Sequence, residues 1–255
     1  MMRGMYTAAS GMMAQQMNID NISNNLANVE STAFKQSRVD FQDLLYAHTQ
    51  DPNTGATAGN QVGMGVRAAS TQKIFTQGTI ARTGNNFDVA IEGDGFFQVT
   101  TPDGKVAFTR DGAFTLNKDG ELVTQAGYST GVKIPKDHTN VTIKPNGEIW
   151  ATQINEIKAK QIGQMKLTRF LNPTGLKAIG GNLYEATEVC GAMTSDIPGQ
   201  NGLGIVAQGF LEKSNVNVVA EMMNIIQAQR AYEMAQKGVQ AADEMTRMAN
   251  QLHKG

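Results

Sequence analysis

The sequence predicts an α+β fold in which a long helix at each end of the chain flanks a central all-β domain, and the two helices form a coiled-coil-like pair. Near both termini, apolar or small residues recur at alternating steps of three and four, the spacing that lets two helices pack side by side. In the middle, short apolar runs alternate with Asp-Gly and Asn-Gly pairs, which favour hairpin turns. At 255 residues, the chain can hold one large domain or a core domain with extensions.

The N-terminal helix is expected from about residue 5 to about residue 29. Its apolar stripe consists of Met5, Ala8, Met12, Ile19, Ile22, Leu26 and Val29. The opposite face carries neutral amides and hydroxyls, with Asp20 nearly its only charge. Because Asn and Ser side chains compete for the backbone hydrogen bonds, this helix would be marginal in isolation. The composition therefore favours a helix that is surrounded by other protein.

The C-terminal helix is expected to begin after Asn217, a favourable N-cap, with Glu221 complementing the helix dipole in the first turn. It can run to about residue 252, and its methionines give it an adaptable apolar surface. Its stripe consists of Ile225, Ala228, Tyr232, Ala235, Val239 and Ala242, and continues, shifted by one position, to Leu252.

Two charge-poor stripes at opposite ends of one chain favour a protein that assembles through its ends. A single stripe is more often a domain's own packing face, and that alternative stays open for each helix taken alone. Contacts are expected either within one chain or between neighbouring copies. They would join Met5, Met12, Ile19, Ile22 and Leu26 to Ile225, Tyr232, Val239 and Leu252.

The central region is expected to be all-β. Strands are expected at residues 96–99, 106–109, 114–116, 141–143 and 165–170, and hairpin turns at Asp103-Gly104, Asp111-Gly112, Asp119-Gly120 and Asn146-Gly147. Residues 49–65 should form a loop or an extended hairpin arm, and a loose stretch at 191–204 should precede a strand-like segment at 205–210. The expected division is a terminal helical domain (1–35 and 214–255), a connecting region (36–80 and 188–213) that holds the arm at about 46–65, and a central β domain (81–187).

Composition and motifs indicate no catalytic, metal or cofactor site. The net charge of −1 does not favour nucleic acid or anionic lipid as a partner. The single Cys190 excludes an internal disulfide framework, and the three histidines lie too far apart in sequence to suggest a metal site. Gly93-Asp94-Gly95 indicates a tight turn, because a nucleotide loop needs a third glycine and a following helix. Residues 115–120 indicate a hairpin rather than half a calcium loop. The scattered Asp and Glu of the β region leave a catalytic carboxylate pair as an open alternative.

Membrane insertion is not expected, because no apolar run approaches the roughly 20 residues that a spanning helix needs. The stretch 3–14 has the positive charge and the short apolar run of a secretory signal. No small-x-small cleavage site follows it, and the helical stripe continues through Ile19 and Leu26. This stretch is therefore expected to stay in the mature protein, which would leave the cytoplasm without a cleaved signal peptide.

Residues 15–29, QQMNIDNISNNLANV, with the Phe-Lys pair that follows, closely resemble the N-terminal signature of bacterial flagellar rod and hook proteins. Four further segments carry the resemblance, in the same order, along nearly the whole chain: 41–46, 93–99, 108–114, and 214–218 with 229–233. Ala33 departs from the pattern, because the family usually has glycine before the Phe-Lys pair, and the backbone bend that this glycine permits is expected to be made in another way here. The motif residues carried over from the family are Asn24, Asn25, Leu26, Asn28, Phe34 and Lys35. The segment 24–28 is expected to mediate lateral contacts.

The resemblance implies a non-enzymatic axial subunit that polymerises helically into the distal rod, the drive shaft that transmits torque and encloses the export channel. The implied partners are further copies of the chain, proximal rod and hook subunits, the bushing rings and the flagellar export apparatus. The implied location is the basal body, spanning the periplasm and reached by type III export. The terminal segments of such subunits are expected to stay disordered until assembly.

The arm at 46–65, with Tyr46, Pro52, Gly55 and Gly65, lies where distal rod subunits carry a segment that the bendable hook lacks. We hypothesise that it reaches neighbouring subunits and stiffens the tube. Two alternatives stay open. The nearer one is a proximal rod or hook subunit, and the other, from a different class, is a periplasmic enzyme or glycan-binding β domain with helical anchors.

Overall fold

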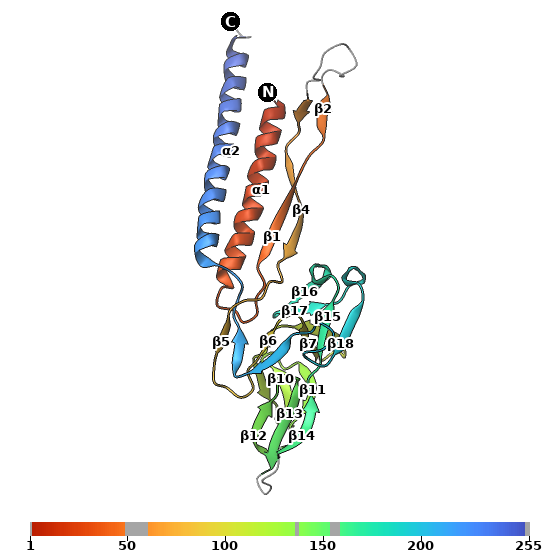
Figure 1. The fold of residues 1–255 in the computed structure, drawn as a ribbon. Coiled ribbons are helices and arrows are strands. Elements are labelled where there is room, and N and C mark those ends of the chain that lie inside the picture. The colour runs from red at the N-terminus through yellow and green to blue at the C-terminus, as the bar shows by residue number, and fades with distance from the viewer. Residues whose placement is uncertain (1, 49–60, 136–137, 154–158, 253–255) are drawn as a thin grey trace. The chain divides into compact units, whose positions relative to one another are not determined.

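The computed structural model describes residues 2–48, 61–135, 138–153 and 159–252, which form two compact units (Figure 1). Unit 1 consists of residues 1–27, 37–74 and 217–255, and unit 2 of residues 28–36 and 75–216. Unit 1 therefore gathers both ends of the chain together with an internal segment. The division of the chain into three regions, made from the sequence, stays a prediction.

Unit 1 contains two long helices, α1 (Met2–Ala27) and α2 (Val218–Leu252), which lie side by side and run in opposite directions (Figure 1). The start of α2 agrees with the prediction, because the side-chain oxygen of Asn217 accepts a hydrogen bond of 3.2 Å from the amide of Ala220. Helix α1 ends slightly earlier than expected, and a turn follows it. The α+β class with a helix at each end is confirmed, whereas the coiled-coil packing of the pair stays a prediction.

A two-stranded ribbon completes unit 1 and packs on α1. In one part of the ribbon, β1 (Ser37–Asp43) pairs with β4 (Val66–Lys73). In the other part, β2 (Tyr46–His48) pairs with β3 (Gln61–Gly63). Both pairs are antiparallel, and the amide of Leu44 donates to the carbonyl of Gly65 between them, at 2.9 Å. Of the predicted loop or arm at 49–65, residues 61–63 form β3, and residues 49–60 lie outside the described residues. Pro52 and Gly55 lie outside the described residues.

Unit 2 is built from short β strands, as predicted. Its main sheet has nine strands in the order β16-β17-β8-β7-β11-β10-β9, with β15 pairing with β7 and β18 pairing with β15. A three-stranded sheet (β12-β13-β14) and the pairs β19–β6 and β20–β5 accompany it. The strands are β5 (Ile80–Arg82), β6 (Val89–Glu92), β7 (Phe96–Thr100), β8 (Val106–Thr109), β9 (Phe114–Leu116), β10 (Glu121–Thr124), β11 (Ser129–Lys133), β12 (His138–Ile143), β13 (Glu148–Gln153), β14 (Ala159–Gln164), β15 (Leu167–Phe170), β16 (Lys177–Gly180), β17 (Leu183–Glu185), β18 (Met193–Asp196), β19 (Ile205–Gln208) and β20 (Phe210–Glu212), with the 3-10 turns η1 (Pro173–Gly175) and η2 (Glu188–Cys190).

Three of the four predicted turn pairs join hairpins, and one does not. Gly104, Gly120 and Gly147 have positive φ angles of 76°, 77° and 78° and connect β7–β8, β9–β10 and β12–β13. The prediction for Asp111-Gly112 is wrong, because β8 and β9 are not neighbours in the sheet. Gly112 is required for another reason: a Cβ at this position would collide with the carbonyl oxygen of Val89.

The prediction of a loose stretch at 191–204 is also wrong in part. Residues Met193–Asp196 form β18, whose register with β15 runs from Leu167↔Asp196 to Phe170↔Met193. This strand is polar and largely exposed, so its residues lack the apolar alternation by which a strand is predicted. Pairing with a partner strand, rather than burial, makes it a strand.

Candidate assembly surface and buried charge cluster

Large apolar side chains are exposed on both helices of unit 1. On α1 these include Tyr6, 74% exposed, and Met13, 69% exposed. On α2 they are Val218, Val219, Met222, Met223, Ile226, Met234, Met245 and Met248. Because exposed apolar surface of this extent is uncommon on a monomeric protein, it indicates a surface that other protein covers. We call these α1 and α2 side chains the exposed helix faces.

The predicted stripe residues lie between the exposed helix faces and the interior of unit 1. Ile22 and Ala228 are buried, and the large apolar stripe residues that are half-buried are Met5, Met12, Ile19, Leu26, Ile225, Tyr232 and Val239. The side chain of Leu252 lies outside the described residues. The helices approach closely at Gly238, where an added Cβ would lie 3.9 Å from the Cβ of Ala8. The structure thus brings α1 and α2 together, and the individual side-chain pairs stay predictions.

The asparagine motif has an internal role that sequence reasoning did not assign. Asn25 is buried, and its side chain makes two hydrogen bonds with the backbone of Ser37: Oδ1 accepts from the amide at 2.9 Å, and Nδ2 donates to the carbonyl at 2.8 Å. Asn21 donates to the same carbonyl at 2.7 Å. A carboxamide offers a donor and an acceptor together, so Asn25 holds the start of β1 on α1. Asn24 is exposed and Leu26 half-buried.

The ribbon meets α1 at Gly65, whose φ is +112°. A Cβ there would collide with the hydroxyl of Ser10, which itself accepts a hydrogen bond of 3.3 Å from the amide of Val66. Glycine is therefore required at this position by both conformation and space. Tyr46, at the other end of the predicted arm, is half exposed on β2.

The second half of the motif, Phe34-Lys35, lies inside unit 2. Lys35 forms a buried charge cluster with Arg110 and Glu212. The Nζ of Lys35 donates to one carboxylate oxygen of Glu212 at 2.6 Å, and both side chains are fully buried. The Nε of Arg110 lies 3.0 Å from the other oxygen. This second contact is an ion pair rather than a well-directed hydrogen bond. A carboxylate shared between two cations makes the burial of all three tolerable.

The cluster is also bonded to the backbone around it. Lys35 donates to the carbonyl of Thr76 at 2.7 Å, and Arg110 donates to the carbonyl of Gly93 at 2.5 Å. Glu212 accepts from the amide of Gly78 at 2.8 Å. Three segments that carry the resemblance, around residues 35, 93 and 110, therefore converge on Glu212. Sequence reasoning could not find Glu212, because nothing near it in the chain marks it as a partner.

Burial sets the protonation behaviour of the cluster. Desolvation lowers the pKa of Lys35, and the attraction of Glu212 opposes this effect. Desolvation raises the pKa of the neighbouring Tyr184 phenol well above its usual range, so this group stays neutral. A buried and lowered pKa can mark a catalytic group. Here the ammonium group of Lys35 is fully enclosed by its partners, which leaves no room for a substrate.

Ala33, where the family usually has glycine, keeps the bend that glycine would make. Its φ is +54°, and its side chain is only 1% exposed. Its amide donates to the backbone carbonyl of Glu212 at 2.8 Å. A left-handed conformation costs a non-glycine residue roughly 1–2 kcal/mol, so the surrounding structure imposes it.

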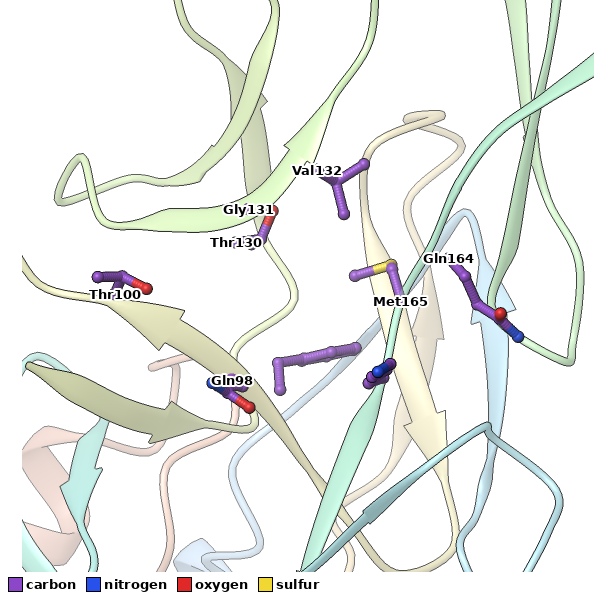
Figure 2. Close-up of a pocket in the computed structure, with 9 residues that line it drawn as sticks. Gln98, Thr100, Thr130, Gly131, Val132, Gln164 and Met165 are labelled. Carbon is purple, nitrogen blue, oxygen red and sulfur yellow. The ribbon is translucent and has the colours of Figure 1, made fainter.

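Unit 2 also contains a cavity of about 280 Å³ where β11 and β15 diverge from β7. Figure 2 shows Val132 and Met165 turned into the space between these strands. The wall is completed by uncharged residues and one lysine, Lys166. Among the residues that line it are two threonines, and His, Cys, Asp and Glu are not among them. Among the described residues there is also no group of three or more His, Cys, Asp or Glu placed to hold a metal. No helix in the described part of the chain is long and apolar enough to span a membrane.

Three regions of the chain match known protein families. Residues 5–35 match the flagella basal body rod protein family, residues 90–151 the flagellar hook protein FlgE/F/G D1 domain, and residues 207–252 the flagellar basal body rod FlgEFG protein C-terminal family. Full-length relatives agree with these matches. The chain is 44% identical over 264 residues to the flagellar basal-body rod protein FlgG of Borreliella burgdorferi, covering all of both chains. The chain belongs to the flagellar rod and hook protein family.

Other relatives distinguish rod from hook proteins within this family. The protein of the same name from Caulobacter vibrioides is 42% identical over 98% of this chain and 99% of its own length. The flagellar hook protein FlgE of Helicobacter mustelae is 43% identical over 136 residues, but these cover 50% of this chain and 30% of the hook protein. Along its whole length the chain is therefore similar to rod proteins, and along half of it to a hook protein. The family consists of structural proteins, so the chain is not an enzyme.

Proposed function

We propose that this chain is a structural subunit of the flagellar basal-body rod and that it polymerises through the exposed helix faces of unit 1. The observation that carries this proposal is the uneven distribution of exposed apolar side chains, most of which lie in unit 1. A helical polymer covers such faces with neighbouring copies, and their near neutrality lets identical copies approach without repulsion. Full-length similarity to basal-body rod proteins supports the same assignment.

Within the rod, we propose the distal segment, where the polymer transmits torque and encloses the export channel. The partners would be further copies of this chain, proximal rod and hook subunits, the surrounding rings and the export apparatus. The location would be the basal body across the periplasm, reached without cleavage of the N-terminus. The full-length similarity to rod proteins supports this assignment over that of a hook subunit.

The arm at 46–65 would stiffen the polymer by reaching neighbouring subunits. Its paired strands β2 and β3 support this proposal, because an antiparallel ladder gives the base of the arm a defined register. Deleting residues 49–60, between these strands, should give a rod that bends in electron micrographs. A straight rod after the deletion would refute the stiffening role.

The assembly role is tested by placing charges on the exposed helix faces of the full-length chain. The variant Met222→Glu with Met234→Glu should fold normally, since both side chains are more than half exposed, but should no longer form straight tubes at concentrations where the wild type does. Sedimentation velocity and electron microscopy measure the assembly. The matched control is Gln227→Glu with Gln236→Glu, which adds the same charges to the same helix at polar, exposed positions.

Normal tubes from the methionine variant would rule out α2 as the assembly surface. Loss of tubes in both variants would mean that added negative charge, rather than lost apolar contact, blocks assembly.

A further inference from the structure

The chain crosses between the two units at four places: 27/28, 36/37, 74/75 and 216/217. At three of them, 36/37, 74/75 and 216/217, unit 2 has a short flanking segment. We call the flanking segments 34–36, 76–78 and 212–215 the exit segments. They are distant in sequence, but all three are bonded to one another within unit 2.

A single side chain, that of Asn215, connects the three exit segments. Its Oδ1 accepts from the amide of Gln36 at 2.7 Å. Its Nδ2 donates to the carbonyl and the hydroxyl of Thr76, at 3.2 and 3.0 Å. Its own amide donates to the carbonyl of Phe34 at 3.3 Å. Each of these bonds has a direction, so together they set the register of one exit segment against the others.

The buried charge cluster makes the same connections a second time. Lys35 belongs to the first exit segment, donates to Thr76 in the second and pairs with Glu212 in the third. Glu212 in turn accepts from the amide of Gly78 in the second. Apolar side chains of similar volume could fill this space with equal or better stability. The polar side chains of the cluster differ from such replacements in making directional bonds to the backbone of the exit segments.

We propose that Lys35, Glu212 and Asn215 are positioning residues for assembly, which hold the exit segments of unit 2 in one arrangement so that the stretches 37–74 and 217–255 of unit 1 start from a fixed base. The proposal rests on the proposed function of the chain as a polymer subunit. Its physical reason is entropic. Both ends of stretch 37–74 and the start of stretch 217–255 adjoin exit segments, and the cost of bringing these two stretches together falls when their starting points are already joined.

The test separates placement from stability by replacing the charge cluster with apolar residues. The variant Lys35→Met/Arg110→Met/Glu212→Leu removes the directional bonds and retains approximate volume. Its thermal unfolding midpoint should stay near that of the wild type. Hydrogen exchange of the amides of Gly78 and Ala33 should accelerate about tenfold or more, the effect of losing roughly 1.4 kcal/mol of local protection. Amides of Phe96–Thr100 in β7 should be unchanged. The concentration needed for tube formation should rise by a similar factor.

A second variant, Asn215→Leu, loses the three side-chain bonds of Asn215 without involving any buried charge. It should accelerate exchange at Gln36 and raise the assembly concentration, and it remains informative if the triple variant fails to fold. The matched control is Arg82→Met/Lys118→Met/Glu188→Leu, which makes the same replacements at exposed positions of unit 2 and should leave local exchange unchanged. The variant Lys35→Arg, which keeps the cation, should form tubes at a lower concentration than the triple variant does.

Two outcomes would overturn the proposal. One is normal assembly of both the triple variant and Asn215→Leu despite faster exchange at the exit segments. The other is loss of the unit 2 fold in both variants, which would make these residues stability determinants. A wild-type chain that does not polymerise refutes the proposed function instead, and the exchange measurements then still decide whether the exit segments are held together.

Discussion

The three hydrophobic clusters of the described chain all lie in unit 2. In unit 1, the buried apolar residues among those described are Ala14, Ile22 and Ala228. The exposed large apolar side chains show the opposite distribution and are concentrated on α1, α2 and the ribbon of unit 1. One chain thus contains a unit that completes its own core and a unit that does not.

The difference follows from the two types of secondary structure. In unit 2, strands present alternate side chains to two faces, and two sheets with their connections can enclose both. Phe96, Phe108 and Phe170, for example, pack edge to face within one cluster, with ring centroids 4.8–5.7 Å apart. In unit 1, two helices and a two-stranded ribbon are too few to cover every apolar face. We infer that unit 2 supplies the stability of the monomer and unit 1 the contacts of the polymer.

The largest effect is expected from Glu212→Leu, which leaves Lys35 and Arg110 buried without their shared partner. Breaking a buried ion pair costs about 3–5 kcal/mol, so the unfolding midpoint of unit 2 should fall far below that of the wild type in a thermal melt followed by circular dichroism. The control Glu188→Leu, at an exposed position of the same unit, should melt as the wild type does. Equal midpoints for the two variants would break the comparison, because unit 2 would not depend on its interior charges.

A smaller loss is expected from Asn25→Ala in unit 1. The Ser37 amide loses its acceptor, at a cost of about 1–3 kcal/mol, whereas the Ser37 carbonyl keeps the bond from Asn21. Hydrogen exchange should accelerate at the start of β1 and leave the strands of unit 2 protected. Faster exchange throughout unit 2 would show that the two units do not open independently.

The third prediction concerns pH and Asp111 of unit 2. Burial raises the pKa of this carboxyl above its ordinary value of 3.8, and hydrogen bonds from Ala113 and Thr32 partly oppose the shift. Because the folded state holds the proton more tightly than the unfolded state, Asp111 lowers stability at neutral pH, and this cost disappears as the pH falls through the raised pKa. Asp111→Asn should therefore stabilise unit 2 at pH 7 by about 1 kcal/mol or less.

The gain of Asp111→Asn should vanish in melts recorded below the ordinary pKa of the carboxyl. Asp103→Asn serves as the control, because Asp103 lies in an exposed turn where Asn-Gly is equally favourable. A gain that does not change with pH would show that the amide stabilises by packing rather than by charge.

The smallest effect on stability, and a large one on assembly, is expected from Met13→Lys on α1. The side chain is 69% exposed, so the free energy of unfolding should change by no more than about 0.5 kcal/mol. Sedimentation should nevertheless show the variant as a monomer where the wild type forms tubes. The control Gln16→Lys adds the same charge on an exposed polar position of the same helix. A destabilised monomer would show that unit 1 depends on Met13 for its own packing.

Local patterns determined much of this fold. The step of three and four reflects the helical repeat, the N-cap at Asn217 makes a hydrogen bond three residues along the chain, and the glycines of three hairpin turns supply positive φ angles. Each of these signals is contained in one short stretch of sequence. The family resemblance was equally local. It identified Phe34-Lys35 and the asparagine motif, and the motif was expected to make lateral contacts rather than the internal bonds of Asn25 to Ser37. The same locality explains the errors: Asp111-Gly112 carries a turn pattern, and β18 carries no strand pattern.

Tertiary structure alone decided the rest. Lys35 and Glu212 are 177 residues apart in the chain, and only the fold makes them partners. Ala33 adopts a conformation that alanine disfavours by itself, because the carbonyl of Glu212 and a closely packed interior fix it there. Asn25 can be buried, although it is polar, because its side chain makes hydrogen bonds with the backbone of Ser37. A sequence encodes which groups need partners, since that need is a property of each residue, but the identity of the partners depends on distances that only the folded chain defines.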